Sequence, residues 1–509
     1  MKMKKRLFTI ITILSCLYTF ISCDNFIDET NPNKIPVESY FQTENDVERA
    51  VNAIYLAIRS NSCLGETSYL YTEERSDNMG RLDNQSSAGE PFQFTDFSLL
   101  PSNTYLRSHW NSLYTAITRS NFVLTYIDDV EFENETDKTN ISAEAKFLRA
   151  LVYFHLVRKW GDVPLVTKFL STQDEIKEIT FREKQETVYA QIIADLSDGM
   201  QSSLPNIQPA SGKGRTCKAA ISALLGQVYL TMATSQIGDE NSNLNAAKQY
   251  LEEAYKMRTF GDLSEIPYSD VFNVEKKNSC PEIIFQIQYI QGDKDYSSVI
   301  ATKNQPKGEY INSQKVSTGT GNFVNPDIVN EFEENDIRKE WSIQYSSYSN
   351  AYFITKFRDA SDAAGTLGYG GNDWILMRYA DVILMLAEVN QLLNNETDAI
   401  GYLNQVRNRA GLSSYEESIK DVQYKSNYPN LKLAILHERR LELAFENHRW
   451  FDLLRFFNTD ELVTYIHAKK QEDYGISNIK NFGTKDRYYP IPFDENKLDP
   501  EKMYQNPGY

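Results

Sequence analysis

The stretch YADVILMLAEVNQLLNNETDAIGYLNQV, residues 379–406, decides the fold class. Its first half places Ile383, Leu386 and Ala387 on one face at helical spacing. Its second half places Ala399, Leu403 and Val406 on one face of a second helix in the same way. Small residues let two helices approach closely, and large residues fill the groove between them. The stretch therefore predicts a pair of closely packed helices.

A similar pattern occurs earlier in the chain. One expected helix carries Leu225, Gly226 and Tyr229, and the next, after a long insertion, carries Ala247, Leu251 and Ala254. With Ala387 at the small eighth position, the later pair fits the pattern of a tetratricopeptide repeat, and the earlier pair looks like one. Such pairs cannot bury their apolar faces alone, so a scaffold of three or four stacked pairs is expected.

Two further helices are expected in the first third of the chain. Apolar residues recur at helical spacing over residues 47–58, behind Asn45 as the N-cap. A second amphipathic helix is expected to open at Ser142 and to stop at Gly161 and Pro164.

Two long stretches have a different character. Residues 60–105 and 259–372 are rich in Gly, Asn, Ser, Asp and Tyr, and the second contains short β-like runs at 283–289 and 352–357. Long loops inside a compact domain usually carry function. The predicted fold class is therefore mostly α: stacked tetratricopeptide-like helix pairs with long irregular loop insertions and a few short β strands. The insertions are expected to form the binding surface on this rigid frame.

The beginning of the chain predicts export. Four cations in the first six residues precede an uncharged apolar run, residues 7–21, which is short for a membrane-spanning helix. Residues 1–22 therefore read as a signal peptide, and the small Ser22 before Cys23 predicts that Cys23 is lipidated. Cys16 is an alternative site, although cleavage there would leave apolar residues exposed. An ordinary secreted protein with a chance cysteine also stays open.

Composition limits the possible partners. The formal net charge of -17 would repel phosphate backbones, so nucleic acid is not expected as a partner. Cys63, Cys217 and Cys280 are too few for a disulfide framework, so the fold must depend on its core. The chain has 32 Tyr, whose flat amphipathic rings suit sugars or peptides.

No enzyme or metal motif is complete. His437-Glu438 lacks the second histidine of a zinc protease, and no histidine pairs with another His or Cys at metal-ligand spacing. Residues 211–216, SGKGRT, lack the first glycine of a phosphate-binding loop and are expected to cap the following helix. We therefore expect no cofactor, no metal and no catalysis. A glycosidase carboxylate pair stays open, because its members need only meet in space.

Several segments together resemble the SusD/RagB family of surface nutrient-binding lipoproteins. Their order and spacing carry the resemblance: CDNFID at 23–28, AEAKFLRA at 143–150, WGDVPL at 160–165, MRYADVILMLAE at 377–388, ERRLELAFE at 438–446, HRWFDLLR at 448–455, YPIP at 489–492 and NPGY at 506–509. One departure is Asn447, where the family usually has glycine. Asn tolerates a left-handed backbone, so the bend there is expected to persist.

The resemblance implies both architecture and role. It divides one compact unit into an N-terminal region, residues 23–235, and a C-terminal region, residues 236–509. It implies a lipid-anchored protein on the surface of the outer membrane that binds an oligosaccharide, or in some members a peptide, and passes it to a SusC-like TonB-dependent transporter. A helical scaffold without a small ligand, or a surface glycoside hydrolase, are the rival interpretations.

The ligand site has no motif of its own, so its residues are predicted from their chemistry. Flat rings and hydrogen-bonding groups gather at Tyr69, Tyr71, Glu73, Arg75, Asp77, Asn78 and Arg81, and further rings lie at Tyr289, Tyr296 and Tyr310. The charged residues Arg439, Arg440, Glu442, Glu446, Arg449 and Asp452 are expected instead to pair with one another or with neighbours inside the fold. Trp110, Trp160 and Trp450 are expected to be packing anchors.

Overall fold

The computed structural model describes residues 40–81, 84–306, 308–310, 312–313, 323–475 and 477–509. The predicted signal peptide, residues 1–22, and the predicted lipidation site Cys23 lie outside the described residues. Within these residues, no helix is both long enough and apolar enough to cross a membrane.

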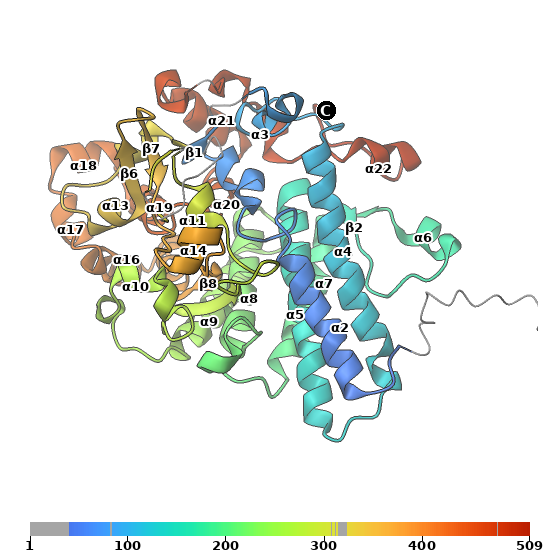
Figure 1. Ribbon diagram of the computed structural model, residues 1–509. Coiled ribbons are helices and arrows are strands. Elements are labelled where there is room, and N and C mark those ends of the chain that lie inside the picture. Colours follow the sequence, from blue (N-terminus) through green and yellow to red (C-terminus); the bar gives the residue numbers. More distant parts are fainter. Residues whose placement is uncertain (1–39, 82–83, 307, 311, 314–322, 476) are drawn as a thin grey trace, which may run out of the picture.

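Four long helices pack together in the N-terminal part of the chain: α2 (Glu44–Ile58), α4 (Thr104–Tyr126), α5 (Glu135–Trp160) and α7 (Gln185–Met200). Figure 1 shows α2, α4 and α5 side by side. Both predicted starts are corrected. The N-cap of α2 is Thr43, in a capping box with Asp46, and not Asn45. The N-cap of α5 is Asn134, so this helix begins two turns before Ser142. Its predicted end at Gly161 is confirmed, with φ of 74°.

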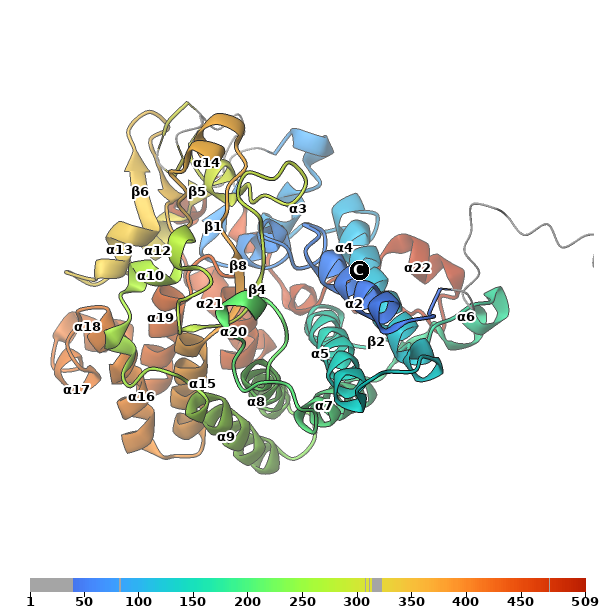
Figure 2. The same ribbon diagram turned by 60° about the horizontal axis from the view of Figure 1, so that its bottom comes forward.

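The remaining long helices form the predicted pairs: α8 (Lys218–Thr234) with α9 (Glu240–Lys256), and α15 (Tyr379–Leu392) with α16 (Glu396–Arg409). The helix α19 (Leu431–Glu442) packs on α15 and α16. In Figure 2, α8 and α9 lie between α5 and α7 on one side and α15 and α16 on the other. Residues 235–239 alone join α8 to α9, so the long insertion predicted between them is wrong.

Close helix packing explains the glycine in the α8–α9 pair. A Cβ atom built on Gly226 would lie 2.5 Å from Cγ of Leu251. Only a residue without a side chain allows the two helices to come this near, as expected for a tetratricopeptide-like pair.

The predicted irregular insertions contain many short elements. Residues 60–105 form η4 (Ser68–Tyr71), η5 (Glu73–Arg75), β1 (Met79–Gly80), η6 (Ser86–Gly89) and α3 (Phe92–Thr95). Residues 259–372 form η9 (Leu263–Glu265), α10 (Tyr268–Val271), η10 (Val274–Lys276), β4 (Ile283–Ile287), α11 (Ile300–Lys303), β5 (Phe323–Val324), α12 (Pro326–Val329), α13 (Ile337–Ser342), β6 (Ile343–Ser346), β7 (Ala351–Ile354) and α14 (Asp362–Leu367).

Other short elements complete the chain. They are η7 (Ile127–Asp129), β2 (Val163–Pro164), α6 (Gln173–Ile179), β3 (Arg182–Glu183), η8 (Ala210–Gly212), β8 (Trp374–Arg378), α17 (Tyr415–Ser418), α18 (Val422–Asn427), α20 (Arg449–Phe456), α21 (Thr459–Ala468), η11 (Gln471–Tyr474), η12 (Ile479–Asn481), η13 (Thr484–Arg487) and α22 (Phe493–Leu498).

Three small antiparallel sheets connect the two insertions and the helices. One has the strand order β1-β5-β7-β6, so it joins the first insertion to the second. The others pair β2 with β3 and β4 with β8. The predicted β-like runs at 283–289 and 352–357 correspond to β4 and β7. The mostly helical fold class is confirmed.

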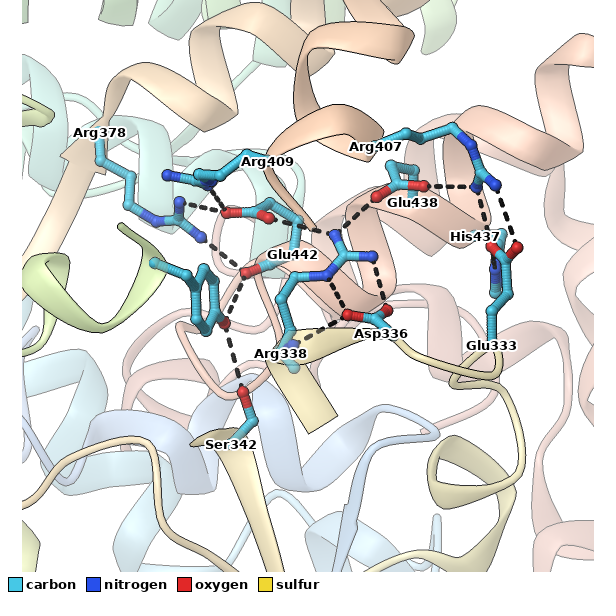
Figure 3. Close-up of polar contacts among 12 residues, drawn as sticks. Glu333, Asp336, Arg338, Ser342, Arg378, Arg407, Arg409, His437, Glu438 and Glu442 are labelled. Atoms are coloured by element: carbon cyan, nitrogen blue, oxygen red, sulfur yellow. Dashed lines mark hydrogen bonds and ion pairs between the residues drawn. The ribbon is translucent and has the colours of Figure 1, made fainter. Parts of the chain in front are cut away.

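The apolar core consists of one large and two smaller clusters, and the predicted packing anchors Trp110 and Trp160 in the large cluster and Trp450 in a smaller one are buried. Beside this core lies a buried network of ion pairs (Figure 3). Arg338, Arg378 and Arg409 all contact the carboxylate of Glu442. Burial raises the pKa of Glu442, but the three guanidinium groups outweigh it and hold the pKa well below its usual value. This network fixes the C-terminal helices.

Candidate ligand-binding site

Five of the ligand contacts predicted in the first insertion are buried parts of the fold: Tyr71, Glu73, Arg75, Asp77 and Asn78. Asp77 accepts hydrogen bonds from Arg449 Nε at 2.7 Å and from Tyr465 Oη at 2.9 Å. Burial raises the pKa of Asp77, but Arg440 and Arg449 hold it well below its usual value. The prediction selected these side chains for their rings and hydrogen-bonding groups and contained no information on their direction. In the structure they face inward.

The other members of this buried group also contact side chains inside the fold. Asn78 donates to Glu73 Oε1 at 2.7 Å, and Arg440 Nε donates to Asn78 Oδ1 at 2.9 Å. Arg75 donates to the backbone and side chain of Asp486. Tyr71 stacks on His109 with ring centroids 3.9 Å apart. None of the five can touch a ligand that arrives from solvent, so they are removed from the candidate surface.

The predicted pairing of the C-terminal signature charges is confirmed. Arg439 pairs with Asp452, and Arg440 and Arg449 both reach Asp77. Asn447 has φ of 68°, as the sequence predicted for this bend. These residues hold the first insertion onto the C-terminal helices.

Two residues of the first insertion lie closer to the surface. Arg81 is half-buried, and its Nη1 lies 3.0 Å from both carboxylate oxygens of Glu74. Tyr69 is also half-buried and packs against the apolar core. They stay at the edge of the candidate surface.

The predicted tyrosines of the second insertion separate into two groups. Tyr289 is buried, and its hydroxyl accepts a hydrogen bond from the backbone N–H of Glu66. Tyr296 and Tyr310 are 42% and 67% exposed. Tyr296 lines a pocket beside α2 and lies in different surroundings from Tyr310.

Exposed aromatic side chains are concentrated in this second insertion. Among the described residues, the large exposed aromatics are Tyr296, Tyr310, Tyr345, Tyr348 and Phe493. Tyr345 and Tyr348, 47% and 79% exposed, lie on the hairpin of β6 and β7. We call Tyr310, Tyr345 and Tyr348 the tyrosine cluster.

Contacts within the hairpin hold Tyr345 in place. Tyr345 lies opposite Tyr352 in the register of β6 and β7, and their ring centroids are 5.2 Å apart in an edge-on arrangement. Tyr352 is half-buried against the core, so it supports the more exposed ring. The hydroxyl of Tyr345 donates to Asn350 Oδ1 at 2.5 Å.

The segment that carries Tyr310 runs beside the same hairpin. Ser346 Oγ donates a hydrogen bond to the carboxylate of Glu309, the residue before Tyr310. A Cβ atom on Gly308 would lie 4.0 Å from the ring of Tyr348. The segment that carries Tyr310 and the hairpin that carries Tyr345 and Tyr348 therefore lie side by side.

Sequence reasoning missed Tyr345 and Tyr348. The signal was available in the run IQYSSYSNAYF at 343–353, where two short β-like runs flank a Ser- and Asn-rich turn. A hairpin on the surface of an insertion exposes the side chains of one face. The run therefore predicts that at least one of its tyrosine rings lies in solvent. In the part of the chain that the structure describes, no group of three His, Cys, Asp or Glu side chains is arranged to hold a metal ion.

Comparisons with known proteins give a consistent picture. The model of the SusD family matches residues 341–509, and the model described as "Starch-binding associating with outer membrane" matches residues 25–230. The chain is 26% identical to SusD-like protein P2 of Formosa agariphila, over 98% of this chain and 99% of that protein. It is 22% identical to the starch-binding protein SusD of Bacteroides thetaiotaomicron, over 82% of this chain and 81% of that one.

Solved structures agree. A laminarin-binding SusD-like protein is 26% identical, with a TM-score of 0.73, and the match covers 92% of this chain and all of that one. Surface glycan-binding protein A of Bacteroides thetaiotaomicron, in complex with laminarihexaose, matches with a TM-score of 0.74 over 91% of this chain and 100% of that chain. Its 20% identity supports a likeness of fold.

Proposed function

Because the chain belongs to the SusD family, we propose that it binds an oligosaccharide at the tyrosine cluster and delivers it to a partner TonB-dependent outer-membrane transporter. The single observation that carries the ligand site is the gathering of three exposed tyrosines on one hairpin and its neighbouring segment. The carbohydrate ligand is supported by the relatives, one of which binds laminarin and another starch.

The chemistry of the cluster suits a sugar. A tyrosine ring offers an apolar face to the C–H groups of a sugar, while its hydroxyl stays available for hydrogen bonds. Glu309 and Asn350 add carboxylate and amide groups beside the rings. Exposed rings that already sit on a supported hairpin need little ordering when the ligand binds.

Delivery requires release, which limits the affinity. A micromolar to millimolar dissociation constant corresponds to about -8 to -4 kcal/mol. Two or three stacked rings with a few hydrogen bonds are compatible with this range, because association itself costs several kcal/mol.

The membrane part of the proposal rests on the family and on the beginning of the chain. A matching family model is described as associating with the outer membrane. We assign the anchor to Cys23, with two or three acyl chains for stable attachment. Fatty-acid labelling should therefore be lost in Cys23→Ala and kept in Cys16→Ala. The reverse result would move the anchor to Cys16.

The ligand proposal is tested by titration calorimetry with laminarihexaose, maltohexaose, cellohexaose, xylohexaose and mannohexaose. At least one should bind, and Tyr345→Ala and Tyr348→Ala should each weaken it by about tenfold, since each removes a stacking face. Phe493→Ala is the matched control, because Phe493 is an exposed aromatic on α22, far from the hairpin (Figures 1 and 2). If all three variants bind the oligosaccharide with the affinity of the wild type, the cluster is excluded as the site.

The same samples separate the rival functions. If short peptides bind at the same rings and no oligosaccharide binds, the ligand class is peptide and not oligosaccharide. Shortened saccharides in the reaction mixture would show hydrolysis and contradict a pure binding role. Absence of any ligand would favour a helical scaffold.

A further inference from the structure

The exposed face of α2 forms one wall of a pocket of about 480 Å³. Arg49, Asn52, Ala53, Leu56 and Arg59 line this wall at spacings that place them on one side of a helix. The opposite side of α2 is buried against the core. The pocket is therefore a feature of the solvent face of a well-anchored helix.

The other walls come from distant parts of the chain. Gly214 and Arg215 contribute from the SGKGRT segment, and residues 286–288 contribute from the end of β4. Tyr296 contributes the exposed ring. The expectation that residues 211–216 cap the following helix is corrected, because the N-cap of α8 is Cys217. This basic segment instead faces the pocket.

The charge of the pocket contrasts with that of the molecule. Three arginines, Arg49, Arg59 and Arg215, line it, and no Asp or Glu does, in a chain of net charge -17. Among the described residues, no ion pair joins Arg49 or Arg59 to a carboxylate. Asp46 lies one turn before Arg49 on α2, and its pKa is lowered mainly by hydrogen bonds from Thr43 and to a smaller extent by Arg49. Arg215 is partly neutralised by Glu144, whose carboxylate is 2.8 Å away. An acidic chain that gathers unpaired guanidinium groups in one hollow provides a local attraction for anions.

Neighbouring rings position the guanidinium of Arg59. It lies over the ring of Tyr296, 4.5 Å from the centroid, and 5.4 Å from the centroid of buried Tyr289. Its Nη2 donates to the backbone oxygen of Asp295 at 2.8 Å. Guanidinium has several N–H donors in one plane, so the others remain for a planar or tetrahedral anion.

The polar groups of the pocket suit more than a bare anion. Gln288 is exposed and lines the pocket, so its side-chain amide is available to a ligand. An amide oxygen accepts hydrogen bonds, so it matches a hydroxyl and not an anion. Asn52 adds a further amide, and Leu56 and Tyr296 add apolar surface. Anion donors, a free acceptor and apolar surface together fit a sugar that carries a negative group.

We propose that this pocket is a second binding site, separate from the tyrosine cluster, which takes the carboxylate or sulfate group of an acidic sugar. None of Tyr310, Tyr345 and Tyr348 lines it. The saccharide part of the proposal rests on the proposed function, whereas the anion part depends on the pocket alone. Arg49 and Arg59 would contact the anion, and Gln288 a hydroxyl.

The test is titration calorimetry of the full chain with trigalacturonate, galactose 6-sulfate, neutral galactotriose and inorganic sulfate. At least one acidic sugar should bind more tightly than galactotriose, and the affinity should fall as salt is raised from low to physiological ionic strength. Arg59→Ala and Arg49→Ala should each lower the affinity for the acidic sugar by about tenfold. Arg59→Lys should lower this affinity less, because lysine keeps the charge.

Two controls make the result specific. Arg107 is an exposed arginine on α4 that pairs with Asp494, so Arg107→Ala should leave the acidic sugar bound as before. Tyr345→Ala should also leave it unchanged, which separates this site from the proposed function. The proposal is overturned if neither acidic sugar binds, if Arg49→Ala and Arg59→Ala bind as the wild type does, or if Tyr345→Ala abolishes binding. Equal affinity for inorganic sulfate would overturn the saccharide part.

Discussion

At the scale of single residues, Asp77 shows how a buried carboxylate can connect distant parts of a chain. It contacts Arg449, Arg440, Lys469 and Tyr465, all from the C-terminal part of the molecule. A buried charge of this kind is stable only while its partners remain. The residue is thus a joint between the first insertion and the C-terminal helices.

Removing one of these partners should therefore lower the stability of the fold more than it lowers the affinity for the ligand. Arg449→Ala should lower the free energy of unfolding by roughly 3–5 kcal/mol, measured by urea denaturation. Arg107→Ala, which breaks an exposed pair with Asp494, should change it by about 1 kcal/mol or less. Unchanged stability of Arg449→Ala together with lost oligosaccharide binding would show that the cluster of charges is a ligand site.

A second residue gives the molecule a dependence on pH. His437 Nδ1 lies 2.9 Å from Glu331, and Nε2 lies 3.4 Å from Glu333. Burial lowers the pKa of His437, but the two carboxylates outweigh it and raise the pKa above 6.5. A folded-state pKa above the unfolded value gives stability that is fully present below about pH 6.5 and is lost as pH rises through the folded-state pKa.

Thermal denaturation from pH 6 to 9 should therefore show a steeper loss of stability in the wild type than in His437→Gln. Over this range the wild type should lose about 1.4 kcal/mol more free energy of unfolding than His437→Gln for each unit by which the pKa of His437 is raised. Buried Glu66 and Glu73, whose pKa values burial raises to about 7, contribute to both proteins and cancel in the comparison. Parallel pH profiles would mean that His437 stays neutral in the folded protein.

At the scale of elements, the helix pairs could be predicted from the sequence and the sheets could not. Residues 379–406 carry their own packing pattern, because helical periodicity is local. The pairing of Met79 with Val324 joins segments more than two hundred residues apart, and the pairing of Val324 with Tyr352 adds the hairpin of β6 and β7 to the same sheet. No local pattern contains such a register, so neither the inward face of residues 71–78 nor the position of the Tyr310 segment beside the hairpin could be predicted, whereas the hairpin itself had a local signal in residues 343–353.

Two glycines test the packing of the helix pairs. In Gly226→Ala the new Cβ would meet Leu251 at 2.5 Å, so the free energy of unfolding should fall by about 1–3 kcal/mol. In Gly401→Ala, on α16, the Cβ meets nothing within 4 Å, so stability should rise by about 0.5–1 kcal/mol. Urea denaturation measures both. A stabilising Gly226→Ala would show that α8 and α9 are not closely packed there.

At the scale of the whole molecule, the helices form a rigid frame, and the second insertion carries one surface and helps α2 and residues 214–215 to form another. The tyrosine cluster offers exposed rings, and the pocket beside α2 offers arginines. The family resemblance was sufficient to predict the architecture, because its motifs lie on the helices and their ends. It could not locate either surface, because the residues of α2, of the β6–β7 hairpin and of the loops that build them belong to no fixed motif.

The most direct test of the central claim is amide hydrogen exchange of the full chain, with and without a saturating amount of the neutral oligosaccharide that binds most tightly in the calorimetric panel. A preformed site on a rigid frame should protect only the amides near the ligand. The account predicts that protection increases at residues 343–354, in the hairpin that carries Tyr345 and Tyr348. Protection elsewhere, with the exchange of residues 343–354 unchanged, would contradict it.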